Sequence, residues 1–372
     1  SVLDQEVQQR LAEIDRIATQ TNFNGQKILD GTFGSATFQV GANAGETISL
    51  NLSQSVRTSQ IGRISDYVGG SVNNSSVYQG QQGSGVDGTA LGAGEVTIAV
   101  GSGTAVSIGA ATAGSANGQG TDSAFAKAAA INAAGVSGVT TTAATDLSFA
   151  FTTVVATSYT MTINGTSIYS SFNASSSNIT SATFIAAVNA NTSATGVSAE
   201  LNGSNVVLRA ADGRNITMTQ NASTVGNGLN ATAGNNASTT TATMNVATAG
   251  TAVTNTYRGT IRLTSTQALT IGGTVARIGA VASQGLNNSG ISSGSVTTAT
   301  NANTMMSLAD AALDTVSTLR GTLGAMGTRI EATINSILVN SENLQAARSR
   351  VLDTDYAAET ANLTRSQVMQ QA

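Results

Sequence analysis

The sequence contains no cysteine and no histidine, and these two absences exclude much of the common chemistry of protein sites. Without cysteine the chain forms no disulfide, no thiolate metal site and no thiol nucleophile. Without histidine it lacks the commonest general base and metal ligand, so neither a Ser-His-Asp triad nor an H-E-x-x-H metalloprotease motif exists. We therefore predict that the chain is not an enzyme and holds no cofactor. One enzymatic alternative stays open, which is glycoside hydrolysis by a pair of carboxylates, although only four acidic residues occur from position 122 to position 212.

Proline and tryptophan are also absent, and charged residues are scarce. Average usage would give a chain of this length about 19 prolines and a charged fraction of about 25%. Here charged residues make up 10% and aromatic residues 4%, while Gly alone accounts for 40 of the 372 positions. This composition is typical of a β-rich secreted protein rather than of a cytosolic enzyme.

The charge pattern and the hydropathy exclude two classes of partner. The net charge is −4, and no cluster of Lys and Arg occurs, so neither nucleic acid nor an anionic membrane is expected to bind. No run of 18 apolar residues occurs either, so membrane insertion is not expected. No signal peptide is recognisable. The length of 372 residues allows two or three domains.

The stretch from Met305 to Val351 carries an apolar heptad repeat, which predicts a long helix with one stripe facing a partner helix. At 1.5 Å per residue this helix would be a rod of roughly 70 Å, which cannot bury its own stripe. The polar residues Thr333 and Asn340 interrupt the repeat. One set of heptad positions is Ala309, Val316, Leu323, Ile330, Ile337, Leu344 and Val351, and the companion set is Met305, Ala312, Leu319, Met326, Thr333, Asn340 and Ala347.

Two features bear on the continuity of this rod. Gly321, Gly324 and Gly327 each cost a helix roughly 1 kcal/mol against Ala, so they indicate either close approach of another element or a locally weak helix. Further along, Asp353 and Asp355 supply helix-capping side chains. We therefore expect the rod to end near Arg350 and a separate last segment to begin there.

The beginning of the chain supplies elements that can cover part of the rod. Ser1 to Ala18 is amphipathic, and Leu11 and Ile14 lie on its apolar stripe, so we expect a helix that packs against the rod. Residues 36–40 and 46–52 alternate apolar and polar side chains on either side of a Gly/Asn loop, which predicts a β-hairpin.

The middle of the chain is a different environment. Residues 1–70 carry 12 charged side chains, whereas residues 71–256 carry 9 in a much longer stretch. This stretch holds a degenerate repeat of strand, strand, helix, strand, in which Ala-Ala-x-Asn recurs in the helix and Gly-Val-Ser follows it. The strands and helices of the two copies are predicted at 96–100, 105–108, 122–134 and 136–140, then at 159–163, 166–169, 181–191 and 196–201.

These observations predict an α+β multidomain fold. We expect a discontinuous α-helical rod or coiled-coil inner domain with a β-hairpin, and β-rich α+β outer domains inserted into it. The predicted boundaries are 1–70 and 290–372 for the inner domain, 71–156 and 157–256 for two outer modules, and 257–289 for a β segment that returns to the rod.

Segments at both ends of the chain resemble bacterial flagellin, the subunit of the flagellar filament. The resemblance is carried by roughly residues 1–55 and 300–372, and it is weaker in the variable middle region. The matching runs are Gln9–Ile17, Thr21–Gly31, Phe38–Asn43, Leu319–Ala325 and Ala346–Asn362.

The resemblance implies a secreted structural protein that is exported unfolded and polymerises into an extracellular filament for motility. It implies other copies of the subunit, an export chaperone and a filament cap as partners. The packing residues it implies are Leu11, Ile14, Val316, Leu319, Leu323, Ile330, Ile337 and Leu344. Because the chain starts and stops inside helical patterns, we expect a fragment that lacks both terminal polymerisation helices and stays monomeric.

The resemblance also implies recognition of the inner domain by an innate immune receptor of the Toll-like class. By position, Glu6 and Gln9 on the first helix and Leu313 on the rod would form that surface, although a solvated helix face with one packing leucine explains the same residues. Two other interpretations stay open. One is a protein of the hook–filament junction, which shares the helical ends, and the other is an adhesin or glycan-binding outer domain carried on the filament.

Overall fold

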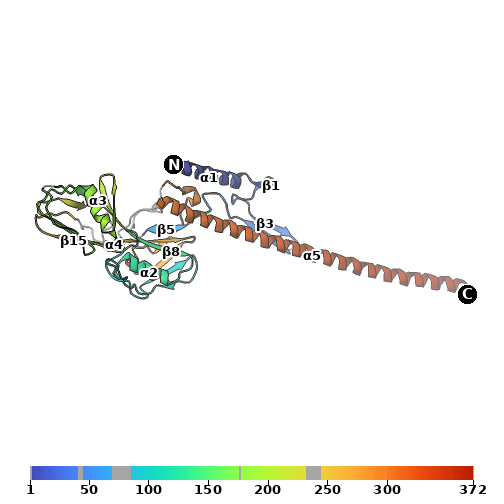
Figure 1. Ribbon diagram of the computed structural model, residues 1–372. Helices are drawn as coiled ribbons and strands as arrows, with labels where there is room; N and C mark the ends of the chain where they lie inside the picture. The colour runs from blue at the N-terminus through green and yellow to red at the C-terminus, as the bar shows by residue number, and fades with distance from the viewer. Residues whose placement is uncertain are drawn as a thin grey trace. The chain divides into compact units, whose positions relative to one another are not determined.

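The computed structural model (Figure 1) has a long C-terminal helix, several small β-sheets and short helices between their strands. The chain divides into a larger unit, Ser1–Asp4 with Gly62–Ala311, and a smaller unit, Gln5–Ile61 with Ala312–Ala372. The structure describes residues 2–40, 45–68, 85–175, 177–231, 244–297 and 299–371.

The predicted amphipathic helix is confirmed as α1 (Val2–Gln20), which belongs to the smaller unit from Gln5 onward. A turn of two residues with positive φ, Asn24 and Gly25, follows it and joins β1 (Asn22–Phe23) to β2 (Gln26–Lys27). Asn-Gly is the preferred pair for such a tight hairpin turn, because both residues tolerate the left-handed region. The predicted hairpin is confirmed as β3 (Gly34–Gln39) paired antiparallel with β4 (Thr47–Leu52).

The predicted rod is confirmed as one continuous helix, α5 (Ala299–Gln371), which Figure 1 shows in orange and red. Its 73 residues give a length of about 110 Å. The break expected near Arg350 is wrong, because the backbone stays helical through residues 353–355. Extending an existing helix costs far less than starting a new one, so Asp and Thr do not stop it. Within the described residues, a Cβ added at Gly321, Gly324 or Gly327 would meet no other atom within 4 Å, so no close approach accounts for them.

The larger unit contains two separate hydrophobic cores. The first core gathers residues from a four-stranded sheet of order β18-β17-β6-β7, from Ile261 and Leu263, and from the helix α2 (Ala124–Ala133). The Ser123 hydroxyl caps the start of α2 by accepting from the Ala126 amide at 3.2 Å. The other elements around it are β6 (Val96–Val100), β7 (Val106–Ser107), β17 (Leu269–Gly273), η1 (Val275–Ile278) and β18 (Ser283–Gln284).

The second core is built on a four-stranded sheet of order β10-β9-β13-β15 and on α3 (Ser181–Ala190). Thr180 and Thr183 form a capping box at the start of α3. The remaining elements here are β9 (Tyr159–Ile163), β10 (Thr166–Phe172), α4 (Thr192–Thr195), β11 (Ser198–Asn202), β12 (Asn205–Ala210), β13 (Ile216–Ala222), β14 (Gly228–Ala231) and β15 (Val253–Tyr257).

One long strand, β8 (Val139–Thr152), takes part in both cores. It lies in a sheet of order β11-β12-β8-β16-β5, which β14 joins by pairing with β8. Its first half pairs with β16 (Thr260–Ser265), whereas its second half pairs with β12. Val139 packs against the first core, and Phe149 is buried in the second. Strand β5 (Ser65–Val68) forms the edge beside β16, and a short helical turn, η2 (Gly290–Ser293), precedes α5.

The predicted order of strand, strand, helix, strand is confirmed as β6, β7, α2, β8 and then β9, β10, α3, β11. The strand predicted at 136–140 differs in its bounds, because β8 begins at Val139 and continues to Thr152. The recurring asparagine has the same role in both copies. Asn132 donates to the Thr141 carbonyl at 3.2 Å, and Asn189 donates to the Ala199 carbonyl at 2.8 Å. Each asparagine therefore ties the end of its helix to the strand that follows.

Candidate subunit-packing surface

The apolar heptad positions of α5 change from buried to exposed along the helix. In the smaller unit, Ala312 and Leu319 are buried, with Leu319 only 8% exposed, and Val316 is half-buried. Leu323 and Ile337 are exposed, and Leu344 is 70% exposed. Ile330 is half-buried. Beyond Leu319 the stripe therefore offers apolar side chains that the described residues leave largely uncovered.

Other exposed apolar side chains lie around α5 beside the stripe and beyond its last heptad position. Burying a large aliphatic or aromatic side chain contributes about 1.5–3 kcal/mol. Exposed apolar side chains of this kind therefore favour binding to whatever covers them. The exposed apolar residues in this part of the helix are Ile334, Leu338, Val339, Val351, Leu352, Tyr356, Leu363, Val368 and Met369.

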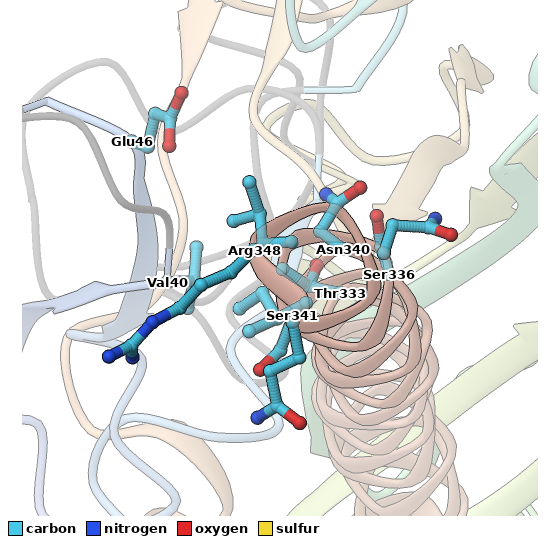
Figure 2. Close-up of a pocket in the computed structure, with 11 residues that line it drawn as sticks. Val40, Glu46, Thr333, Ser336, Asn340, Ser341 and Arg348 are labelled. Carbon is cyan, nitrogen blue, oxygen red and sulfur yellow. The ribbon is translucent and has the colours of Figure 1, made fainter. Parts of the chain in front are cut away.

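A groove of about 920 Å³ lies in the smaller unit where the β3–β4 hairpin approaches α5 (Figure 2). Val40 and Glu46 line it from the hairpin. The α5 residues that line it are Thr333, Ser336, Ile337, Asn340, Ser341, Asn343, Leu344, Gln345 and Arg348. It therefore combines two apolar heptad positions with both of the polar ones.

The residues of this groove suit the packing of a peptide segment. Ile337 and Leu344 supply apolar contacts, while the hydroxyl of Thr333 and the amide of Asn340 sit at heptad positions. A polar side chain at such a position fixes the register of a partner helix, because only one alignment satisfies its hydrogen bonds. The groove was not predicted from the sequence. The predicted hairpin is the one signal that could have indicated it, but the sequence does not show which face of α5 the hairpin approaches.

The predicted residues of α1 fall into two groups. Leu11 is buried, whereas Ile14 is exposed. Glu6 and Gln9 are exposed, and Glu6 forms an exposed ion pair with Arg10 at 3.5 Å. On α5, Leu313 is 65% exposed. The three residues assigned to a receptor surface are therefore all accessible in this structure.

The described residues show no arrangement typical of a metal centre or of a membrane span. Among the described parts of the chain, no three Asp or Glu side chains gather as metal ligands would. None of the helices in those parts combines the length and the hydropathy that crossing a bilayer requires.

The chain is similar to known proteins both in its C-terminal helix and over its whole length. Residues 306–372 match the family model described as the bacterial flagellin C-terminal helical region. The whole chain is 34% identical to the B-type flagellin of Pseudomonas aeruginosa over 383 aligned positions, which cover 74% of that protein. A flagellin of Salmonella muenchen is 48% identical over 63 residues, which cover 17% of this chain and 12% of that protein.

Among solved structures, FliC from Burkholderia pseudomallei matches 29% of this chain and 37% of its own, at 35% identity and a TM-score of 0.16. The identity over the full length of the chain, together with the match of its C-terminal helix, shows that this chain belongs to the flagellin family.

Proposed function

We propose that copies of this filament subunit pack together through the apolar stripe of α5 and the groove beside the hairpin. The observation that carries the proposal is the uncovered heptad row beyond Leu319. Flagellin relatives support assembly into a flagellar filament, and the stripe offers the binding free energy that assembly needs. Of the proposed packing residues, Leu11 and Leu319 pack between elements of the same chain. The residues proposed to contact another copy are Ile14, Val316, Leu323, Ile330, Ile337 and Leu344.

The inner domain and the outer modules predicted from the sequence would then have different roles in the filament. We propose that residues 1–70 and 290–372 form the inner helical domain that builds the filament. The modules 71–156 and 157–256, joined to it by the return segment 257–289, would be the part that the filament displays. The subunit would be exported to the cell exterior, with an export chaperone and the filament cap as partners, and the filament would serve motility.

Glu6, Gln9 and Leu313 are proposed as a surface for a Toll-like receptor. Their exposure supports this assignment. The test measures binding of the purified protein to the receptor ectodomain and compares it with Glu6→Ala, Gln9→Ala and Leu313→Ala. We expect each substitution to weaken binding. Unchanged affinity for all three variants would remove these residues from the receptor surface.

The other interpretations are not favoured, because the relatives that match this chain are named flagellins. Membership of that family supports a structural role rather than catalysis.

The filament role is tested by supplying the complete gene that encodes this chain to a strain whose own flagellin gene is deleted. We expect electron microscopy to show filaments that an antibody against the larger unit labels along their length, and we expect swimming to return. Cells that secrete the protein but carry no labelled filament would contradict the proposal.

A further inference from the structure

The two cores of the larger unit meet at a four-residue loop, Asp212–Asn215. The loop belongs to the second core by its connections, since it follows β12 and precedes β13. Its backbone, however, bonds to segments of the first module. The Phe125 amide in the first turn of α2 donates to the Gly213 carbonyl at 3.0 Å, and the Asn215 amide donates to the Gly118 carbonyl at 2.7 Å.

Side chains add a second set of bonds across the same joint. Gln119 donates to Asp212 at 2.9 Å, and Asn215 donates to Asp122 at 3.1 Å. Within the loop, Arg214 pairs with Asp212 at 2.8 Å, and across the joint it donates to the Asn117 carbonyl at 3.3 Å. Hydrogen bonds to charged groups at partly buried sites are the stronger ones, because solvent screens them less.

The backbone of the loop is closely fitted to its surroundings. Gly213 has a φ of +80°, and a Cβ added there would lie 2.4 Å from the Cβ of Ala143 in β8. Gly118 has a φ of +83°, and a Cβ there would lie 2.3 Å from the Asn215 carbonyl oxygen. Glycine is therefore required on both sides of the joint.

A further contact ties the loop to the strand that both cores share. The buried hydroxyl of Thr145, midway along β8, donates to the Arg214 carbonyl at 2.7 Å. The same arginine donates to the Thr195 carbonyl, at the end of α4, at 3.4 Å. The loop thus bonds to both modules and to β8.

We infer that the Asp212–Asn215 loop is a latch that fastens the two duplicated modules into one rigid body. Without the latch, β8 and the other segments that run from one module to the other would still connect them. Because each module has its own hydrophobic core, the two modules would then rotate relative to each other about β8. The latch sets the orientation of one module on the other, whereas the cores supply the stability of each.

The absence of cysteine allows a direct test in the full-length chain, because introduced cysteines are the only sites for thiol-directed labels. Thr104→Cys in the first module and Ser170→Cys in the second are exposed positions for spin labels. Pulsed electron spin resonance then gives the distribution of distances between the modules. We expect one narrow peak in the parent protein, and we expect Arg214→Ala to replace it with a broad distribution.

Arg209→Ala is the matched control, because Arg209 forms an ion pair with Asp146 at 2.6 Å between β12 and β8 and takes no part in the latch. We expect it to keep the narrow peak. Hydrogen exchange of β13 and β17 reports whether each core stays folded. If Arg214→Ala unfolds the second module, Asp122→Ala opens the latch from the other side.

A broad distribution in the parent protein would overturn the latch, as would a narrow peak in both latch variants. Loss of β13 protection in both latch variants but not in Arg209→Ala would also overturn it, because the loop would then be part of the second core itself.

Discussion

The larger and the smaller unit differ in how completely each buries its apolar residues. The larger unit closes two cores, and residues such as Phe149, Phe184 and Ile98 have no exposed surface. The smaller unit buries only a few apolar residues and leaves the stripe of α5 largely open. The larger unit therefore buries its apolar residues within the single chain, whereas the smaller unit leaves apolar surface of the kind that marks an interaction site.

The two modules of the larger unit show a second contrast. Lys127 in α2 and Phe184 in α3 occupy equivalent positions, each five residues before the recurring asparagine of its copy. Both side chains are fully buried, but Phe184 contacts other aromatic rings, whereas Lys127 donates to Asp87 at 3.0 Å and to two backbone carbonyls. The same position in the repeat thus holds an aromatic side chain packed among other rings in one copy and a buried lysine in an ion pair in the other.

The largest effect is expected from Phe184→Ala in the second core. Phe184 lies 5.0 Å from the ring of Phe151, and its removal leaves a cavity in a closed core. We expect a loss of about 3–5 kcal/mol in the free energy of unfolding, measured by urea denaturation. Val225→Ala, at an exposed position of the same module, is the control and should cost little. Equal costs for the two variants would contradict the contrast between core and surface.

A comparable effect is expected from Asp87→Ala in the first core. The substitution leaves the Lys127 ammonium buried without its carboxylate, which costs about 3 kcal/mol. Lys127→Met removes the buried charge instead, and Asp87 keeps its ion pair with Arg277. We therefore expect Lys127→Met to cost much less, again by urea denaturation. If Lys127→Met proves as damaging as Asp87→Ala, the ion pair does not explain the burial of the lysine.

A smaller, graded effect is expected on acidification. Partial burial works against ionisation of Asp87, but hydrogen bonds from Lys127 and Arg277 outweigh it and hold the pKa of the carboxyl below its usual value. In Asp212, hydrogen bonds from Arg214 and Gln119 likewise outweigh burial and lower the pKa. Carboxyls with lowered pKa values stabilise the fold at a pH above the unfolded value of about 3.9, and this contribution is lost as the pH falls through the folded pKa.

The larger unit should therefore lose stability below about pH 4, and Asp87→Ala should show a weaker dependence on pH in that range. Urea denaturation at several values of pH between 3 and 6 measures both. A free energy of unfolding that stays level or rises toward pH 3 in the parent protein would contradict the role of these carboxylates.

The smallest effect on the isolated chain is expected from Leu344→Ala. Because Leu344 is largely exposed, its truncation should change the free energy of unfolding by no more than about 0.5 kcal/mol. Leu147→Ala, in the closed second core, should cost about 2–5 kcal/mol in the same assay. A large cost at Leu344 would mean that the single chain already covers the stripe.

Periodicity and turn residues predicted much of the fold. The heptad repeat predicted α5, alternation about a Gly/Asn loop predicted the β3–β4 hairpin, and the recurring Ala-Ala-x-Asn predicted two similar modules. These signals are local, so the residues that carry them also form the element.

Features that depend on distant residues were not predicted. The continuity of α5 through Asp353 depends on helix propagation, which local capping signals do not report. The pairing of β8 with both β16 and β12, and the groove beside the hairpin, arise from residues far apart in the chain. For the same reason the heptad repeat identified the stripe but did not show which of its residues, such as Leu319 and Leu344, would be buried or exposed.

The most direct test of filament assembly through α5 compares Leu344→Asp with Asn335→Asp in cells whose own flagellin gene is deleted. Both substitutions place a carboxylate at an exposed position of the same helix, but only Leu344 lies on the heptad stripe. Electron microscopy counts the filaments per cell, and circular dichroism of the purified proteins checks that both remain folded. We predict that Leu344→Asp abolishes filaments and that Asn335→Asp keeps them. Filaments of normal number and length in Leu344→Asp would contradict assembly through the stripe.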